Sequence, residues 1–155
     1  MPTRRHILIA LAATLVATPS LAEQLSARDF LAAIYANYQG KGAKGVDIST
    51  KGAPGKYFTP SLARLIEKDA AKAAKRHEVG TLDGDPFVDA QDFEITDLAI
   101  DVKDTGPDKA VGAVTFKNFG KDVTVMHDLR KLAKGWRIDD IQAPSGSLRA
   151  LFKKA

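Results

Sequence analysis

Apolar and polar residues alternate along the second half of the chain, from residue 93 to residue 141. Val123, Val125, His127 and Leu129 share one face of such a segment. A period of two is typical of β-strands with one buried face. The connections between successive segments are too short for a parallel crossover, which needs about a dozen residues or more. The pattern predicts four antiparallel strands, over residues 93–102, 110–117, 121–132 and 136–141.

The alternation changes phase within the first of these strands. Phe93 and Ile95 follow one parity, whereas Leu98, Ile100 and Val102 follow the other. One extra residue in a strand restores a common apolar face after such a change. We therefore expect a β-bulge near Thr96 and Asp97.

Two amphipathic helices precede the strands. Ser26 is a candidate N-cap for the first helix, which ends at Gly40, and Thr59 with Pro60 begins the second, which ends at Gly80. Residues 39–56, rich in glycine and lysine, predict a surface loop. Ser147 is a candidate cap for a last short helix. The predicted buried faces are Phe30, Leu31, Ile34, Tyr35 and Tyr38 in the first helix, and Leu62, Leu65, Ile66, Ala70, Ala73 and His77 in the second.

Helices followed by an antiparallel sheet predict a single α+β domain over residues 23–155, with the helices packed on one face of the sheet. The chain contains no cysteine, which excludes disulfides, thiolate metal sites and a cysteine-linked lipid anchor. We expect no cofactor.

The first 22 residues have the organisation of a cleaved export signal. Arg4 and Arg5 precede an apolar run over residues 7–17, which is too short to span a bilayer, and small residues precede a cleavage point near Ala22. The tandem arginines resemble a twin-arginine signal, and the general secretory route is the alternative. Removing the signal reduces 23 basic residues to 21, against 19 acidic residues, which leaves a net charge of +2. So small a charge gives no reason to expect nucleic acid as a partner.

Several motifs resemble one bacterial family. They are Phe-Leu-x-x-Ile-Tyr-x-x-Tyr at residues 30–38, Tyr-Phe-Thr-Pro-x-Leu at 57–62, Asp-Gly-Asp-Pro-Phe at 83–87 with Gln-Asp at 91–92, Gly-Trp-Arg-Ile-Asp-Asp-Ile at 135–141 and Ser-Leu-Arg at 147–149. Over residues 27–152 the chain resembles the "domain of unknown function 3828" family, which implies a nuclear-transport-factor-2-like (cystatin-like) fold with a curved sheet. Some relatives are envelope lipoproteins; without the lipidation cysteine, this chain is expected to be free in the periplasm. The family implies no established reaction.

His127 is the candidate general base, because its parity places it on the apolar face of a central strand. Asp92 or Asp140 is the candidate carboxylate partner for an isomerase or dehydratase reaction. The alternative is a core histidine whose ring is hydrogen-bonded within the protein. Tyr35, Tyr38 and Trp136 are candidates for lining a ligand pocket, although aromatic residues at helical spacing are also ordinary core.

The acidic segment 83–108 offers a second kind of site. Asp83, Asp85, Asp89 and Asp92 are close enough in sequence to supply oxygen ligands to calcium. Aspartates beside glycine and proline more often build turns, so the turn interpretation is the alternative. Residues 41–76 are basic, and they could meet an anionic lipid or an acidic partner or form a solvated surface.

Three functions follow from these patterns. The first is an exported binding or accessory domain for a small molecule or an envelope protein, with weak homodimerisation as a further expectation. The second is the small isomerase or dehydratase based on His127. The third is an immunity-type protein that binds a toxin. An open pocket that brings His127 and a carboxylate together would distinguish the enzyme from the binding domain.

Overall fold

The computed structural model describes residues 25–153, and the predicted export signal lies outside this range. Two helical segments, α1 (Ala27–Tyr35) and η1 (Ala36–Tyr38), are followed by α2 (Pro54–Tyr57) and α3 (Pro60–Arg76). The strands are β1 (Ile95–Gly106), β2 (Lys109–Asn118), β3 (Lys121–Leu132), β4 (Gly135–Ala143) and β5 (Gly146–Ser147), and α4 (Leu148–Lys153) ends the described chain. The protein is therefore an α+β domain, as predicted.

The sheet is an antiparallel meander in which every strand pairs with its neighbour in sequence. Phe119 and Gly120 both have positive φ, the geometry of a two-residue hairpin turn that suits the twist of the strands. The two-residue strand β5 extends the predicted four strands to five. It pairs with the end of β4, where Gln142 lies opposite Ser147.

Two bulges interrupt the ladder. The register shifts between Thr96 and Ala99, and Asp97 has a φ of 54°, which confirms the predicted bulge. A second shift, which the sequence pattern did not predict, lies between β3 and β4. There Asp128 and Leu129 pair with Asp140 and Ile138, so that Asp139 is the extra residue.

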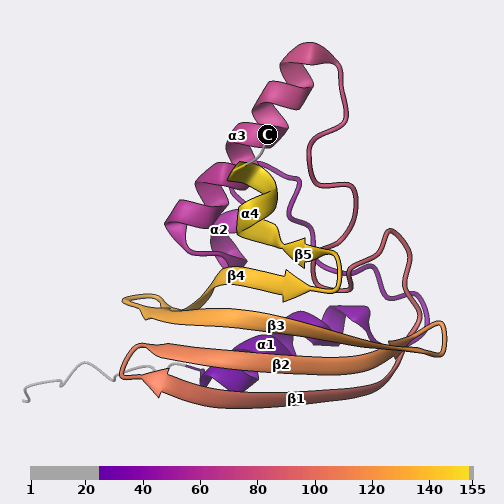
Figure 1. Ribbon diagram of the computed structural model, residues 1–155, viewed down its shortest axis with the longest axis vertical. Coiled ribbons are helices and arrows are strands. Elements are labelled where there is room, and N and C mark those ends of the chain that lie inside the picture. The colour runs from indigo at the N-terminus through magenta and orange to yellow at the C-terminus, as the bar shows by residue number, and fades with distance from the viewer. Residues whose placement is uncertain (1–24, 154–155) are drawn as a thin grey trace, which may run out of the picture.

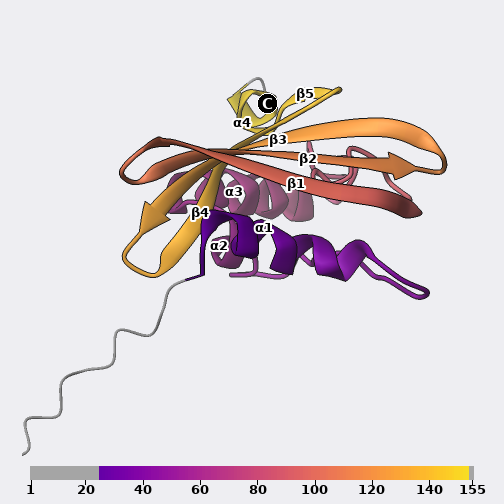
Figure 2. The same cartoon turned by 90° about the horizontal axis from the view of Figure 1, so that it is seen from below.

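The helices cover one face of the curved sheet, with α1, α2 and α3 on the same side (Figure 2). Leu31, Ile34 and Tyr35 of α1 are buried with residues of the facing strands. Val125, His127 and Leu129 are all buried on this face, as the alternation predicted. Helix α4 lies beyond β4, near α3 (Figure 1).

The helices differ from the prediction at their ends. The first helix tightens into the 3-10 segment η1, and α2 forms at the end of the predicted loop. Helix α3 ends at Arg76, because His77 adopts the left-handed conformation that terminates it. Ala70 and His77 are exposed, since the second half of α3 extends away from the sheet (Figure 1). Within residues 25–153, no helix combines the length and apolar character needed to cross a membrane.

Candidate functional site

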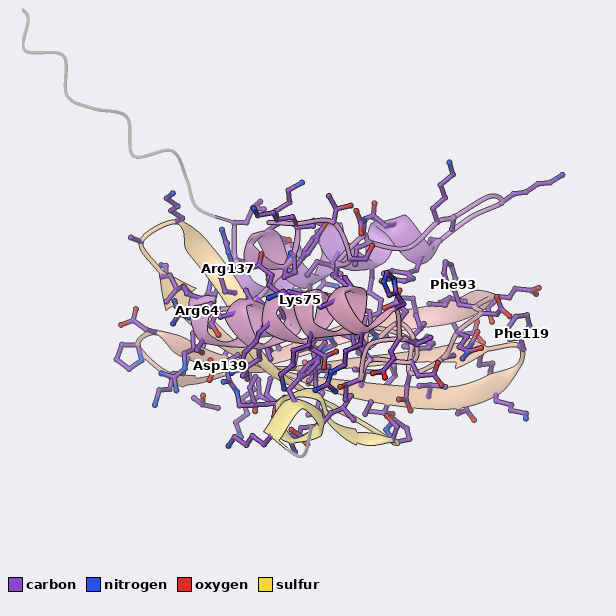
Figure 3. The ribbon with its side chains drawn as sticks, turned by 90° about the horizontal axis from the view of Figure 1, so that it is seen from above. Arg64, Lys75, Phe93, Phe119, Arg137 and Asp139 are labelled. Carbon is purple, nitrogen blue, oxygen red and sulfur yellow. The ribbon has the colours of Figure 1, made fainter. Side chains whose placement is uncertain are left out.

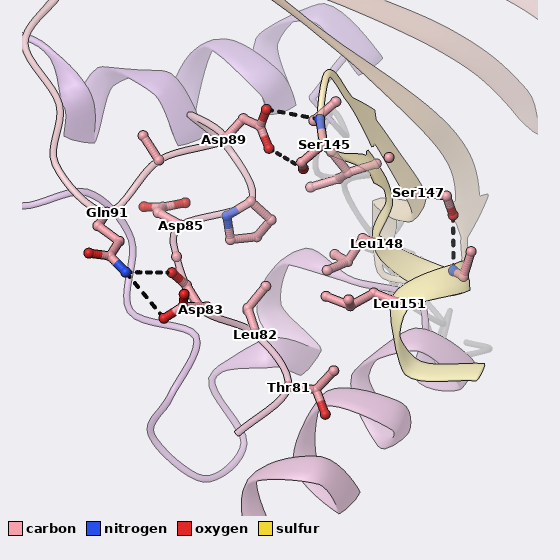
Figure 4. A pocket seen from close by; sticks show the side chains of 17 residues that line it. Thr81, Leu82, Asp83, Asp85, Asp89, Gln91, Ser145, Ser147, Leu148 and Leu151 are labelled. Carbon is pink, nitrogen blue, oxygen red and sulfur yellow. Dashed lines mark hydrogen bonds between the residues drawn. The ribbon is translucent and has the colours of Figure 1, made fainter. Parts of the chain in front are cut away.

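A pocket of about 550 Å³ lies between the segment 81–91 and the C-terminal elements β5 and α4 (Figure 4). Its apolar walls include Leu82, Pro86, Ile141, Leu148 and Leu151. Asp83, Asp85 and Asp89 add carboxylates, and none of the described residues that line the pocket is basic. The pocket therefore combines an apolar surface with a negative charge.

Turn chemistry shapes the wall formed by residues 81–91. The Asp85 carboxylate accepts a hydrogen bond from the backbone N–H of Phe87 at 2.9 Å, and the backbone N–H of Asp85 donates to the Ala90 carbonyl at 2.9 Å. The hydroxyl of Tyr38 donates to Asp85 Oδ2 at 2.6 Å, which ties this wall to the end of η1. The segment is thus closed by an aspartate turn, as its sequence indicated.

Hydrogen bonds of Asp89 join the two walls of the pocket, and further bonds lie within each wall. The Asp89 carboxylate accepts from the backbone N–H of Ser145 at 3.1 Å and from the Ser145 hydroxyl. Gln91 Nε2 donates to Asp83 Oδ1 at 3.1 Å (Figure 4). The Ser147 hydroxyl accepts from the backbone N–H of Ala150 at 3.0 Å, which confirms Ser147 as the cap of α4.

Burial governs the electrostatics at the base of this wall. Burial raises the pKa of Asp85, while the hydrogen bonds from Tyr38 and from the Phe87 backbone oppose the rise. Burial, and then the nearby Asp85 charge, raise the pKa of Tyr38 well above its ordinary value. Tyr38 consequently stays protonated, and its hydroxyl donates a hydrogen bond to Asp85.

The four aspartates proposed for calcium do not converge. The Asp83 carboxylate is hydrogen-bonded to Gln91, that of Asp85 to Tyr38 and that of Asp89 to Ser145. Within residues 25–153, no group of three or more histidine, cysteine or acidic side chains is placed to hold a metal ion. Of these carboxylates, that of Asp85 makes the hydrogen bond expected of an aspartate turn, to the backbone N–H of Phe87, while those of Asp83 and Asp89 bond side chains farther along the chain.

His127 lies inside the core and lines neither this pocket nor a second hollow at the start of α3. Its Nε2 lies 3.3 Å from the Tyr35 hydroxyl, and its ring stacks on Phe87 with centroids 6.2 Å apart. Nδ1 has no hydrogen-bond partner of ordinary geometry among the described residues. Burial lowers the pKa of His127 to about 4, against a smaller opposing effect of the Gly112 and Val125 backbone.

Neither candidate carboxylate is hydrogen-bonded to His127. Asp140 accepts from the Ser147 hydroxyl at 2.7 Å and from the backbone N–H of Arg149 at 2.8 Å, which places it at the start of α4. Asp92 is exposed, and its backbone carbonyl accepts from Asn118. The structure does not assemble the predicted acid–base pair.

The predicted aromatic lining is also core. Tyr35 and Tyr38 are buried and pack around Phe87, and Trp136 is 9% exposed at the start of β4. None of the three lines the pocket. Sequence reasoning missed the C-terminal wall, including Ser145, Leu148 and Leu151. The Asp-Gly-Asp-Pro-Phe motif was the one signal that pointed to the other wall.

The fold and the pocket define the class of this protein: an α+β domain with helices on one face of an antiparallel sheet and a pocket beyond its last long strand. No known protein family and no curated protein matches the chain. A solved structure, the phospholipid-binding protein from Ralstonia solanacearum in complex with a phospholipid, is similar with a TM-score of 0.39 and 20% sequence identity. The similarity covers 70% of this chain and 57% of that protein, so this chain matches little more than half of its length.

Proposed function

We propose that this chain is a non-enzymatic binding or accessory protein that takes its ligand in the pocket between residues 81–91 and α4. The observation that carries the proposal is the separation of the pocket from the histidine: no histidine is among the residues that line the open pocket, while His127 is fully buried in the core. A general base must come within hydrogen-bond reach of the proton it removes. The isomerase or dehydratase interpretation therefore has less support, and the immunity-type interpretation stays a prediction.

The lining indicates the chemistry of the ligand. Leu82, Leu148 and Leu151 offer apolar contacts, and Asp83 is an exposed carboxylate among the lining residues. Ligand pockets commonly combine apolar walls with a few polar groups that orient the ligand. The proposed ligand has an apolar body and one positively charged group, either as a small molecule or as a side chain of a partner protein.

The n-octylammonium ion is a suitable probe, with n-octanoate as its counterpart of opposite charge. In amide-resolved NMR titrations of the full chain, octylammonium should shift the amides of residues 81–91 and 146–151, and octanoate should bind more weakly. Asp83→Asn should weaken octylammonium binding, whereas Asp101→Asn, an exposed position on β1, should leave it unchanged.

A second pair of variants tests the location. Ala150→Trp places a large ring in the pocket and should abolish binding, whereas Ala74→Trp makes the same change at an exposed position of α3. Equal binding of the two probes, or binding that survives Ala150→Trp in a folded protein, would contradict the proposal.

We also propose that the protein works in the periplasm after removal of residues 1–22, and that it belongs to the family it resembles in its motifs. N-terminal sequencing of exported protein tests the first point. A mature N-terminus near residue 23 is expected, and an intact Met1 would reject cleavage.

A further inference from the structure

A second hollow, of about 580 Å³ and wide open to solvent, lies at the start of α3. It shares no lining residue with the pocket described above. Three arginines from three different elements line it: Arg64 of α3, Arg130 of β3 and Arg149 of α4. The other lining residues are Thr59, Pro60, Ser61, Leu132 and Asp139.

Asp139, the extra residue of the β4 bulge, organises two of these arginines. Its carboxylate accepts from Arg130 Nε at 3.1 Å and from an Arg149 terminal nitrogen at 3.0 Å. It also accepts from the Thr59 hydroxyl at 2.9 Å. Burial raises the pKa of Asp139, but Thr59 and the two arginines outweigh that effect and lower it. Asp139 is hydrogen-bonded to two of the three arginines, so the residues that line the hollow carry two more positive charges than negative ones. The carboxylate of Asp128, outside the lining, also interacts with Arg130.

Several hydrogen-bond donors in the hollow remain open to a ligand. A guanidinium group carries five N–H donors, and Arg130 uses only its Nε in a hydrogen bond within residues 25–153. The Arg64 side chain, on the exposed side of α3, makes no hydrogen bond or ion pair with the described residues. Figure 3 shows Arg64 and Asp139 at the same end of α3.

The first turn of α3 adds to this arrangement. The Thr59 hydroxyl donates to Asp139, and α3 begins without a side-chain cap. Pro60 supplies no N–H and the Ala63 N–H is bonded to the Thr59 carbonyl, so it is chiefly the partial positive charge of the helix N-terminus that favours an anion here. This effect reinforces the charge of the arginines.

We propose that Arg64, Arg130 and Arg149 form a binding site for a phosphate group. Guanidinium groups match the geometry of phosphate oxygens and bind them through paired N–H donors. A tetrahedral phosphate presents oxygens in several directions, which suits donors that come from three separate elements. This phosphate site shares no residue with the acidic pocket, so the two sites can bind different ligands.

Titration calorimetry of the full chain with inorganic phosphate at low ionic strength tests the proposal. We expect saturable binding in the millimolar range, and Arg64→Gln should weaken it about tenfold, as for loss of one hydrogen-bonded charge. Arg64 is exposed, so its replacement should leave folding intact. Arg76→Gln is the matched control, because it removes the same charge from an exposed position at the other end of α3.

Vesicles distinguish a lipid phosphate from a phosphate in solution. Binding to vesicles of phosphatidylglycerol with phosphatidylcholine, lost in Arg64→Gln but not in Arg76→Gln, would identify a lipid headgroup as the source. Phosphate binding without such vesicle binding would identify a soluble phosphate compound. Absence of saturable phosphate binding, or equal weakening by Arg64→Gln and Arg76→Gln, would overturn the proposal whether or not octylammonium binds in the other pocket.

Discussion

The hydroxyl oxygen of Tyr35 lies 3.3 Å from Nε2 of His127 in the centre of the core. Tyr35 donates its one hydroxyl proton to the Phe87 carbonyl at 2.7 Å, so its oxygen is left to accept from His127. A proton on Nε2 of the neutral His127 ring therefore has this oxygen as its acceptor. Among residues 25–153, no carboxylate is hydrogen-bonded to this ring to offset the cost of burying a positive charge.

The stability of the protein should fall in mild acid because of His127. Its pKa is about 4 in the folded protein, against 6.5 as the ordinary value, so the unfolded chain binds more protons between these limits. The contribution is complete above about pH 6.5 and is lost as the pH falls towards 4, by about 3 kcal/mol in all. Urea unfolding at a series of pH values measures this loss.

Two variants isolate the histidine responsible. His127→Gln should be less stable than the wild-type protein throughout, but its free energy of unfolding should change much less over the same pH range. His77→Gln replaces an exposed histidine and should retain the wild-type pH dependence. An unchanged pH dependence in His127→Gln would show that other groups cause it.

Gly112 should be intolerant of even one added methyl group. A Cβ at this position of β2 would clash with Leu31 Cδ1, and Leu31, a residue of α1, is fully buried against the sheet. We expect Gly112→Ala to lower the free energy of unfolding by about 1–3 kcal/mol through overpacking. Gly55→Ala, where a Cβ meets nothing within 4 Å, should be close to neutral in the same denaturant series. Equal stability of the two variants would mean that α1 can move away from β2.

The two carboxylates considered for catalysis should differ in their effect on stability. Asp140 accepts hydrogen bonds at the start of α4, from Ser147 and from the Arg149 backbone. Asp140→Ala should cost about 1–3 kcal/mol and increase amide hydrogen exchange in α4. Asp92→Ala should stay within about 0.5 kcal/mol of the wild type, since its side chain is exposed. A stable Asp140→Ala variant with unchanged exchange would contradict the capping role.

Local signals account for what could be predicted of the fold. The alternation around His127 specified a buried strand face, and the change of phase before Leu98 specified a bulge; the register confirms both. Pro60 and Ser147 marked helix starts that the structure reproduces. Each of these features depends on residues within a few positions of one another. The end of α3 was predicted too late, because His77 ends the helix in the left-handed conformation, which glycine adopts more readily.

The sequence by itself determined the strands, the turns and the α+β class, because backbone conformation and side-chain alternation are short-range properties. Only the tertiary structure decided which polar groups meet. Asp89 and Ser145 are 56 residues apart, and Thr59 and Asp139 are 80 apart, yet each pair is hydrogen-bonded. Strand pairing and an unpredicted bulge bring these residues together. Contacts between such distant residues cannot be predicted from the periodicity of the sequence, which reflects local structure only. The pocket and the arginine hollow both arise from them.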